Sequence, residues 1–213
     1  MSTISNKSII IKISFVLNII SLMAFIWLGF RRWHATHPEN KPREIEVVMF
    51  GDSLTAGGEW VYLTKMNNII NSGMSGYNTS QFINEIPGRV LIYHPKICYI
   101  EGGINDVFVG IPINRTLKNI DAIIDSLINH KVIPVLQSVL LTTDSLTNLK
   151  CSELNLKYIE LAKIKNIKYL DINRHIAKTG ILPEIYSEDG VHLKKAAYQI
   201  WASIIVEDLS KRR

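Results

Sequence analysis

Short β-rich apolar runs alternate with longer helical patterns after about residue 44, and this alternation limits the possible folds more than any other feature. Runs rich in β-branched and aromatic residues predict strands, whereas apolar residues three or four positions apart predict helices. The predicted strands are 45–50, 69–71, 97–101, 132–138 and 168–171, and the helical patterns are 60–67, 80–90, 114–129, 146–163 and 196–209. Because crossover helices connect parallel strands, the pattern predicts an α/β fold with a central parallel sheet of about five strands.

Polar or glycine-rich turns follow the first three predicted strands. Ser53 comes after the first strand, Gly73 and Gly76 come after the second, and Gly103 and Asn105 come after the third. In an open parallel sheet, ligands bind beyond the carboxyl ends of the strands. We therefore expect these turns to meet at one edge of the sheet and to form a site there.

The stretch 187–193 contains the two partners that a serine nucleophile needs. A serine hydroxyl is a weak nucleophile at neutral pH and requires a base within hydrogen-bond reach, itself oriented by a third group. Asp189 and His192 are three residues apart, and on a helix-like turn this spacing puts them on one side. The carboxylate then accepts a hydrogen bond from one imidazole nitrogen, and the other nitrogen faces Ser53.

Four ordered blocks give the chain a resemblance to the GDSL-type, or SGNH, hydrolase family. Residues 51–54 (Gly-Asp-Ser-Leu) resemble its first block, and the glycine-containing turn 71–76 resembles its second. Residues 103–106 (Gly-Ile-Asn-Asp) resemble the third block, and 189–192 (Asp-Gly-Val-His) the last. The resemblance implies a three-layer flavodoxin-like fold for residues 44–213.

The resemblance also implies roles for individual residues. Ser53 would be the nucleophile, His192 the general base and then the general acid, and Asp189 the residue that orients the imidazole. The oxyanion donors would be the backbone N–H groups of Ser53 and Gly76 and the side chain of Asn105. The family varies around the glycine of its second block, so the choice between Gly73 and Gly76 is a matter of alignment, and we favour Gly76. Neither a metal nor an organic cofactor is expected.

The expected activity is that of a serine esterase that hydrolyses short acyl esters, acetyl above all, through an acyl-enzyme on Ser53. Short acyl groups are favoured because about 170 residues leave little chain for a lid or a deep acyl tunnel. The substrate would be a small molecule, a glycan or a lipid ester, and the O-acetyl group of a sugar is our preferred hypothesis. The runner-up is a lysophospholipase or acyl thioesterase. A non-hydrolytic anchored binding module is the alternative from another class, and transfer of the acyl group to a sugar hydroxyl remains open.

Residues 13–30 form an 18-residue run without a charge. As a helix this run would be about 27 Å long, close to the thickness of the hydrocarbon core of a bilayer. It predicts a transmembrane anchor after a short tail (1–12) and before a linker (31–43), with a signal peptide as the alternative. Basic residues after the run favour a cytoplasmic domain, but an anchor ahead of a small hydrolase favours the periplasmic or extracellular side, which we prefer.

The charge of the chain does not indicate a nucleic-acid partner. The formal net charge is +5, but residues 1–43 hold six Lys or Arg and one Glu, whereas residues 44–213 hold 18 basic and 18 acidic residues. A neutral folded part without a basic stripe argues against nucleic-acid binding. The two cysteines, Cys98 and Cys151, have no metal-ligand spacing, so a metal site is not expected.

Overall fold

A computed structural model describes residues 19, 21–29, 32 and 44–212. The chain divides after Arg43 into two units, and the whole sheet belongs to the unit Glu44–Arg213. Residues 21–29 of the first unit are helical and exposed. Ten of the 18 residues of the predicted anchor 13–30 are described, namely 19 and 21–29, whereas the tail and all of the linker except residue 32 lie outside the described residues. Among the described residues, no helix is long and apolar enough to cross a membrane.

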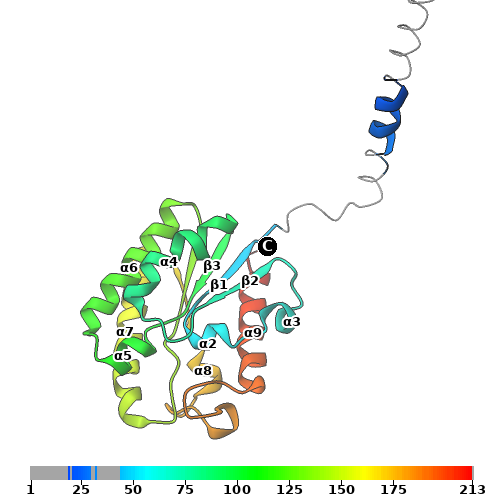
Figure 1. The fold of residues 1–213 in the computed structure, drawn as a ribbon. Helices are drawn as coiled ribbons and strands as arrows, with labels where there is room; N and C mark the ends of the chain where they lie inside the picture. The colour runs from blue at the N-terminus through cyan, green and yellow to red at the C-terminus, as the bar shows by residue number, and fades with distance from the viewer. Residues whose placement is uncertain (1–18, 20, 30–31, 33–43, 213) are drawn as a thin grey trace, which may run out of the picture. The chain divides into compact units, whose positions relative to one another are not determined.

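The second unit contains a five-stranded parallel sheet with the strand order β2-β1-β3-β4-β5 (Figure 1). The prediction of an α/β fold with about five parallel strands is therefore confirmed. The strands are β1 (Val47–Gly51), β2 (Ile69–Gly73), β3 (Ile97–Ile100), β4 (Ile133–Gln137) and β5 (Lys168–Leu170). Residues of β1 and β3 are almost completely buried, because helices cover both faces of a parallel sheet.

Helices form a layer on each face of this sheet (Figure 1). The helices α4, α6 and α7 pack against one another on one face, and α3, α8 and α9 pack together on the other. The helices are α2 (Ser53–Ala56), α3 (Trp60–Thr64), α4 (Thr79–Arg89), α5 (Ile104–Val109), α6 (Ile113–Asn129), α7 (Ser145–Lys165), α8 (Asn173–Ile176) and α9 (Lys195–Ser210). Two short 3-10 helices, η2 (Leu91–Tyr93) and η3 (Glu184–Tyr186), complete the fold.

Trp201 of α9 is the centre of a buried aromatic cluster. Its ring lies 5.0 Å from that of Trp60 and 6.1 Å from that of Tyr198. Its indole Nε1–H donates a 2.6 Å hydrogen bond to Oε1 of Gln137, which is also buried. The cluster therefore joins α3 and α9 to Gln137 at the end of β4.

Trp201→Ala is expected to lower the free energy of unfolding by about 3–5 kcal/mol, because it opens a cavity and removes the partner of Gln137. For a domain of this size the melting temperature should fall by about 10 °C. Thermal unfolding followed by circular dichroism measures the change. Leu156→Ala removes a side chain that is 63% exposed and should have almost no effect. Equal melting temperatures for the two variants would contradict the assignment of this core.

Candidate active site

The carboxyl ends of β1, β2 and β3 bring the predicted turns to one edge of the sheet. The register pairs Gly51 with Gly73 across β1 and β2, and Phe50 with Ile100 across β1 and β3. The three turns that follow these strands are therefore neighbours, although they are far apart in sequence. This placement agrees with the sequence-based expectation.

Ser53 is half-buried at the first position of α2, directly after β1. The side chain of Asp52 caps this short helix, since its Oδ1 accepts a 2.9 Å hydrogen bond from the N–H of Leu54. Position 51 requires glycine, because a Cβ there would lie 2.2 Å from Oγ1 of Thr55 and 2.6 Å from the carbonyl oxygen of Glu101. The tight turn places the Ser53 hydroxyl at the sheet edge.

The loop 187–193 carries the base and the group that orients it. An isolated bridge between Ser187 and Leu193 closes the loop, and Oγ of Ser187 accepts the N–H of Gly190 at 2.7 Å. Gly190 has a φ of 96°, which a residue without a Cβ adopts readily. Asp189 and His192 do lie side by side, but in this bridged loop and not in the helix-like turn that the spacing suggested.

The structure brings the side chains of Ser53, His192 and Asp189 into one hydrogen-bonded chain. Oδ2 of Asp189 lies 2.7 Å from Nδ1 of His192, and Nε2 of His192 lies 3.1 Å from Oγ of Ser53. Oδ1 of Asp189 also accepts the backbone N–H groups of Val191 and His192 at 3.0 and 2.8 Å. With the proton on Nδ1, Nε2 is left free to accept the hydroxyl proton of Ser53.

The hydrogen bonds to Asp189 keep this carboxylate ionised. The bond from the His192 side chain, followed by the bonds from the backbone N–H groups, holds the pKa of Asp189 well below its usual range. A carboxylate that remains charged at all ordinary pH values orients the imidazole and stabilises the imidazolium that forms when Ser53 loses its proton.

The turns after β2 and β3 supply the candidate oxyanion donors. Gly76 has a φ of 78° in a turn that the hydrogen bond from Tyr77 N–H to the Met74 carbonyl closes at 3.2 Å. Asn105 Nδ2 donates to the Tyr77 carbonyl at 2.9 Å, which ties the two turns together. Within residues 44–212, the N–H groups of Ser53 and Gly76 have no acceptor, whereas the N–H of Gly73 donates to Oδ1 of Asn71. This difference favours Gly76 over Gly73 as the donor.

Replacing Asn105 with alanine is expected to lower kcat by about 10²–10³-fold with little change in KM, because an oxyanion donor acts mainly in the transition state. Steady-state hydrolysis of p-nitrophenyl acetate measures both constants. A matched control is Asn119→Ala, which also removes an amide that bonds to neighbouring hydroxyls, those of Thr79 and Ser80. If the two variants had equal kcat values, Asn105 would not be a donor.

Two buried carboxyl groups, those of Asp106 and Glu101, lie close to the turns of Asn105 and Ser53. The carboxylate of Asp106 accepts the N–H and hydroxyl of Thr79 and, at 3.0 Å, the hydroxyl of Thr116. It therefore supports the turn of Asn105. Glu101 was not singled out by the sequence, because a glutamate at a strand end gives no signal of burial, yet its side chain is completely buried beneath the Ser53 turn.

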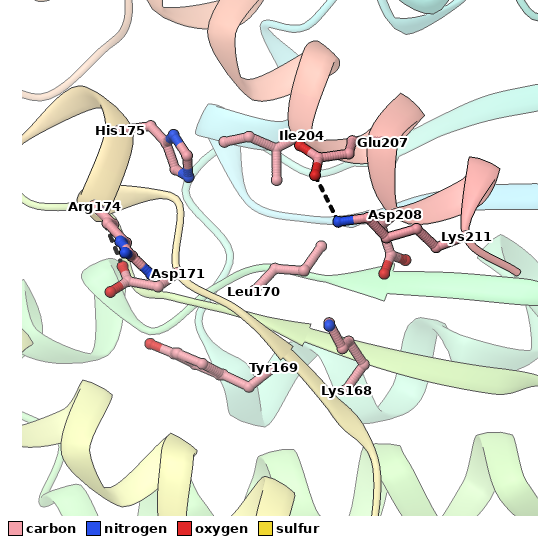
Figure 2. Close-up of a pocket in the computed structure, with 10 residues that line it drawn as sticks. All are labelled: Lys168, Tyr169, Leu170, Asp171, Arg174, His175, Ile204, Glu207, Asp208 and Lys211. Carbon is pink, nitrogen blue, oxygen red and sulfur yellow. Dashed lines mark hydrogen bonds and ion pairs between the residues drawn. The ribbon is translucent and has the colours of Figure 1, made fainter.

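The pocket drawn in Figure 2 lies away from these residues, between the end of β5 and the helices α8 and α9. Its volume is about 330 Å³, and charged side chains of both signs line it, including Lys168, Asp171 and the bonded pair Glu207 and Lys211. Strand β5 is separated from β1 by three strand spacings, or roughly 14 Å. This pocket is therefore not part of the Ser53 site.

The model of the GDSL-like lipase/acylhydrolase family matches residues 49–200 of this chain. The chain belongs to this family. The matched range contains all four sequence blocks, and family membership supports a serine esterase or hydrolase activity in general. Within the described residues, no group of three or more His, Cys, Asp or Glu side chains is placed to hold a metal ion.

Solved structures share the fold of this GDSL-like hydrolase. A GDSL-like lipase from Bacteroides thetaiotaomicron is 24% identical, with a TM-score of 0.73, and the match covers 85% of this chain and 98% of that one. A psychrotrophic esterase from Pseudoalteromonas, solved in a form inhibited by monoethylphosphonate, is 18% identical with a TM-score of 0.65, and the match covers 78% and 97%.

The chain also resembles part of a curated relative. The N-acylneuraminate cytidylyltransferase of Streptococcus agalactiae is 23% identical over 163 residues, which are 76% of this chain. The chain spans only 38% of the length of that relative. The two proteins therefore share a segment, and the relative contains a further portion that this chain does not match.

Proposed function

We propose that the protein hydrolyses short acyl esters through an acyl-enzyme on Ser53. The chain of hydrogen bonds from Asp189 through His192 to Ser53 carries this proposal. Oγ of Ser53 attacks the ester carbonyl carbon while its proton moves to Nε2 of His192, and the carbonyl oxygen becomes an oxyanion. The N–H groups of Ser53 and Gly76 and the amide of Asn105 stabilise this charge.

Collapse of the tetrahedral intermediate breaks the bond to the leaving alcohol, which takes the proton from His192. A water molecule then attacks the acyl-enzyme, gives one proton to His192 and forms a second oxyanion at the same donors. When this intermediate collapses, the proton returns to Ser53 and the carboxylic acid leaves.

The open form of the site supports a short acyl group. The side chains of His192 and Asp189 are 46% and 56% exposed, so no lid covers them in the described part of the chain. The cavity beside this loop has a volume of about 200 Å³ and is lined by residues that include Gly57, Glu188 and Tyr198. Neither Ser53 nor His192 lines this cavity, so it can contact only a part of the substrate beside the loop.

A carbohydrate ester is the preferred substrate class. The curated relative is named for an N-acylneuraminate, which is an acylated sugar. The cavity beside the catalytic loop also offers charged side chains, Glu59, Glu188 and Lys195, and such groups can hydrogen-bond to sugar hydroxyls. We therefore favour O-acetyl groups of a sugar.

The test compares kcat/KM of the purified full-length chain for p-nitrophenyl acetate, octanoate and palmitate, followed by release of acetate from O-acetylated sugars. We expect the acetate ester to be the best of the three and acetate to be released from at least one sugar. A preference for palmitate would reject the short-acyl proposal. No turnover of any ester, together with no labelling by a fluorophosphonate probe, would favour the binding-module alternative.

One observation favours the lysophospholipase or thioesterase alternative. Phe108 and Val109 follow Asn105 on α5 and are 50% and 67% exposed. Apolar side chains beside a reactive centre can contact a long acyl chain. In the chain-length comparison, Phe108→Ser should reduce hydrolysis of palmitate but not of acetate if this alternative holds. If it does not hold, the variant should change neither.

Membrane attachment through residues 13–30, with the catalytic part on the periplasmic or extracellular side, is proposed from the sequence alone. An uncharged run of this length suits a bilayer core. Protease added to intact cells should digest the catalytic part if it is outside and spare it if it is inside. Extraction with carbonate should leave the full chain in the membrane fraction.

A further inference from the structure

Asp52 and Glu101 form a buried pair of carboxyl groups between the turn of Ser53 and the turn of Asn105. Both side chains are completely buried. The N–H of Glu101 donates to the Phe50 carbonyl at 2.9 Å, which holds the end of β3 against the end of β1. Oε2 of Glu101 lies beside Gly51, the residue before Asp52, and the charge of each carboxyl group acts on the other. The pair therefore lies where the nucleophile turn and the oxyanion turn meet.

One oxygen of each carboxyl group already has a partner, and the other has none that donates. Oδ1 of Asp52 accepts the N–H of Leu54 at 2.9 Å, and Oε2 of Glu101 accepts the hydroxyl of Thr55 at 3.0 Å. Oδ2 of Asp52 and Oε1 of Glu101 are buried, and neither receives a proton from any donor in the described residues. Buried polar atoms without a partner are rare and costly. A single proton shared by the two groups would satisfy both oxygens.

We propose that Glu101 is a positioning residue that is held as a neutral carboxylic acid, donates its proton to the carboxylate of Asp52, and thereby fixes the Ser53 turn against the Asn105 turn. Asp52 caps α2 immediately before Ser53, and Glu101 precedes the two glycines that lead to Asn105. A displacement of about 1 Å between reacting groups can lower a rate by about 100-fold. The bond between the two turns thus sets the distance from the nucleophile to one oxyanion donor.

The surroundings favour protonation of Glu101 over Asp52. Burial raises the pKa of Glu101 well above its usual value, and the negative charge of Asp52 raises it further. Burial also raises the pKa of Asp52, but the N–H of Leu54 and the hydrogen bond from Glu101 oppose this effect. Two neighbouring buried carboxyl groups resist ionising together, because the negative charge of one raises the pKa of the other. Glu101 is therefore the group that keeps the proton.

The other titratable groups that face the pair come from four further elements. They are Asp106 of α5, Tyr158 of α7, Tyr198 of α9 and His192 of the catalytic loop. Burial raises the pKa of both tyrosines, so they remain neutral at physiological pH. Tyr158 donates to the Gly102 carbonyl at 3.0 Å and Tyr198 to the Leu54 carbonyl at 2.8 Å. These bonds hold the same two turns and supply no proton to the carboxyl pair.

The first test detects the bound proton. It measures by urea denaturation how the free energy of unfolding of the full chain depends on pH. The unfolded chain releases the Glu101 proton above about pH 4.3, whereas the native state keeps it. The folding equilibrium constant of the natural chain should therefore fall relative to that of Glu101→Gln, by up to about tenfold per pH unit between pH 5 and 7. Groups that do not interact with Glu101 cancel in this comparison, so the difference reports the proton held by the pair of Asp52 and Glu101. Equal pH dependence would overturn the shared proton.

The second test measures kcat for p-nitrophenyl acetate. Glu101→Met removes the donor and should lower kcat by about 100-fold, because the buried carboxylate of Asp52 loses its partner and the two turns separate. Glu101→Gln keeps an N–H donor and an acceptor in the same shape, so it should restore kcat to within about fivefold of the natural chain. A folded glutamine variant as inactive as the methionine variant would overturn the role of the neutral donor.

Gln137→Met is the matched control, because it also replaces a completely buried polar side chain with methionine, at the bond to Trp201. It should lower the melting temperature but leave kcat unchanged within about threefold. If Glu101→Met behaved in the same way, Glu101 would contribute only to stability. The inference rests on the proposed roles of Ser53 and Asn105, but the urea test does not. If the chain had no esterase activity but the urea test still detected the extra proton, the roles of Ser53 and Asn105 would be rejected and the protonated pair of Asp52 and Glu101 would stand.

Discussion

Ser53→Ala is expected to lower ester turnover by at least about 10⁴-fold, because it removes the atom that forms the acyl-enzyme. The melting temperature should stay within about 2 °C of the original, since within residues 44–212 the half-buried hydroxyl is bonded only to the exposed His192 and exposed polar contacts contribute little to stability. Hydrolysis of p-nitrophenyl acetate and thermal unfolding measure the two effects on the same preparation.

A fluorophosphonate probe provides the control for this variant. It should label the natural chain once, at Ser53, and should not label Ser53→Ala. Ser187→Ala offers a matched replacement, because its hydroxyl belongs to the catalytic loop and accepts the N–H of Gly190, yet it should retain labelling. A folded Ser53→Ala variant with full activity would reject the proposed mechanism.

Asp189→Asn is expected to lower kcat by about 10³–10⁴-fold while the chain remains folded. An amide at this position can donate to Nδ1 of His192, which favours the tautomer with the proton on Nε2, and this nitrogen then cannot accept the proton of Ser53. The change should appear in kcat more than in KM, because the carboxylate stabilises the imidazolium of the transition state. Stopped-flow measurement of the first turnover isolates the acylation step.

The low pKa of Asp189 gives a second expectation for the natural chain. Because its folded pKa lies below the usual value, the stabilising bonds of its carboxylate are present above about pH 4 and are lost only in stronger acid. Protonation of Asp189 should therefore cause no loss of activity between pH 5 and 8. If the activity of the natural chain changed with a titration between pH 5 and 8 that is missing in Asp189→Asn, Asp189 would not be ionised throughout this range.

The strands and long helices were predictable because their patterns are local. An apolar run such as 45–50 is buried on both faces of the sheet, and the periodic spacing of 114–129 reflects one buried helix face. The helices α2, α5 and α8 contain only four to six residues, too few to show a period of 3.6. Strand β2 extends two residues further than predicted, to Gly73, because pairing with β1 decides its end.

The ends and turns depended on contacts that no local pattern contains. Helix α3 ends at Thr64 rather than at residue 67, because Lys65 adopts a left-handed conformation with a φ of 56°. The loop of Asp189 and His192 was expected to be helix-like, but the bridge from Ser187 to Leu193 makes it a closed loop. In both cases a local preference competed with packing against distant parts of the chain.

The amino-acid sequence by itself determined which chemical groups the site contains and in which order the chain delivers them to the sheet edge. Only the tertiary structure decided that Ser53 and His192, 139 residues apart, lie within hydrogen-bond distance, and that Glu101 and Asp52 are buried near each other. The reason is that strand order, register and burial arise from contacts between remote segments. Residue type and spacing report local preference, whereas a distance or a shared proton depends on the completed fold.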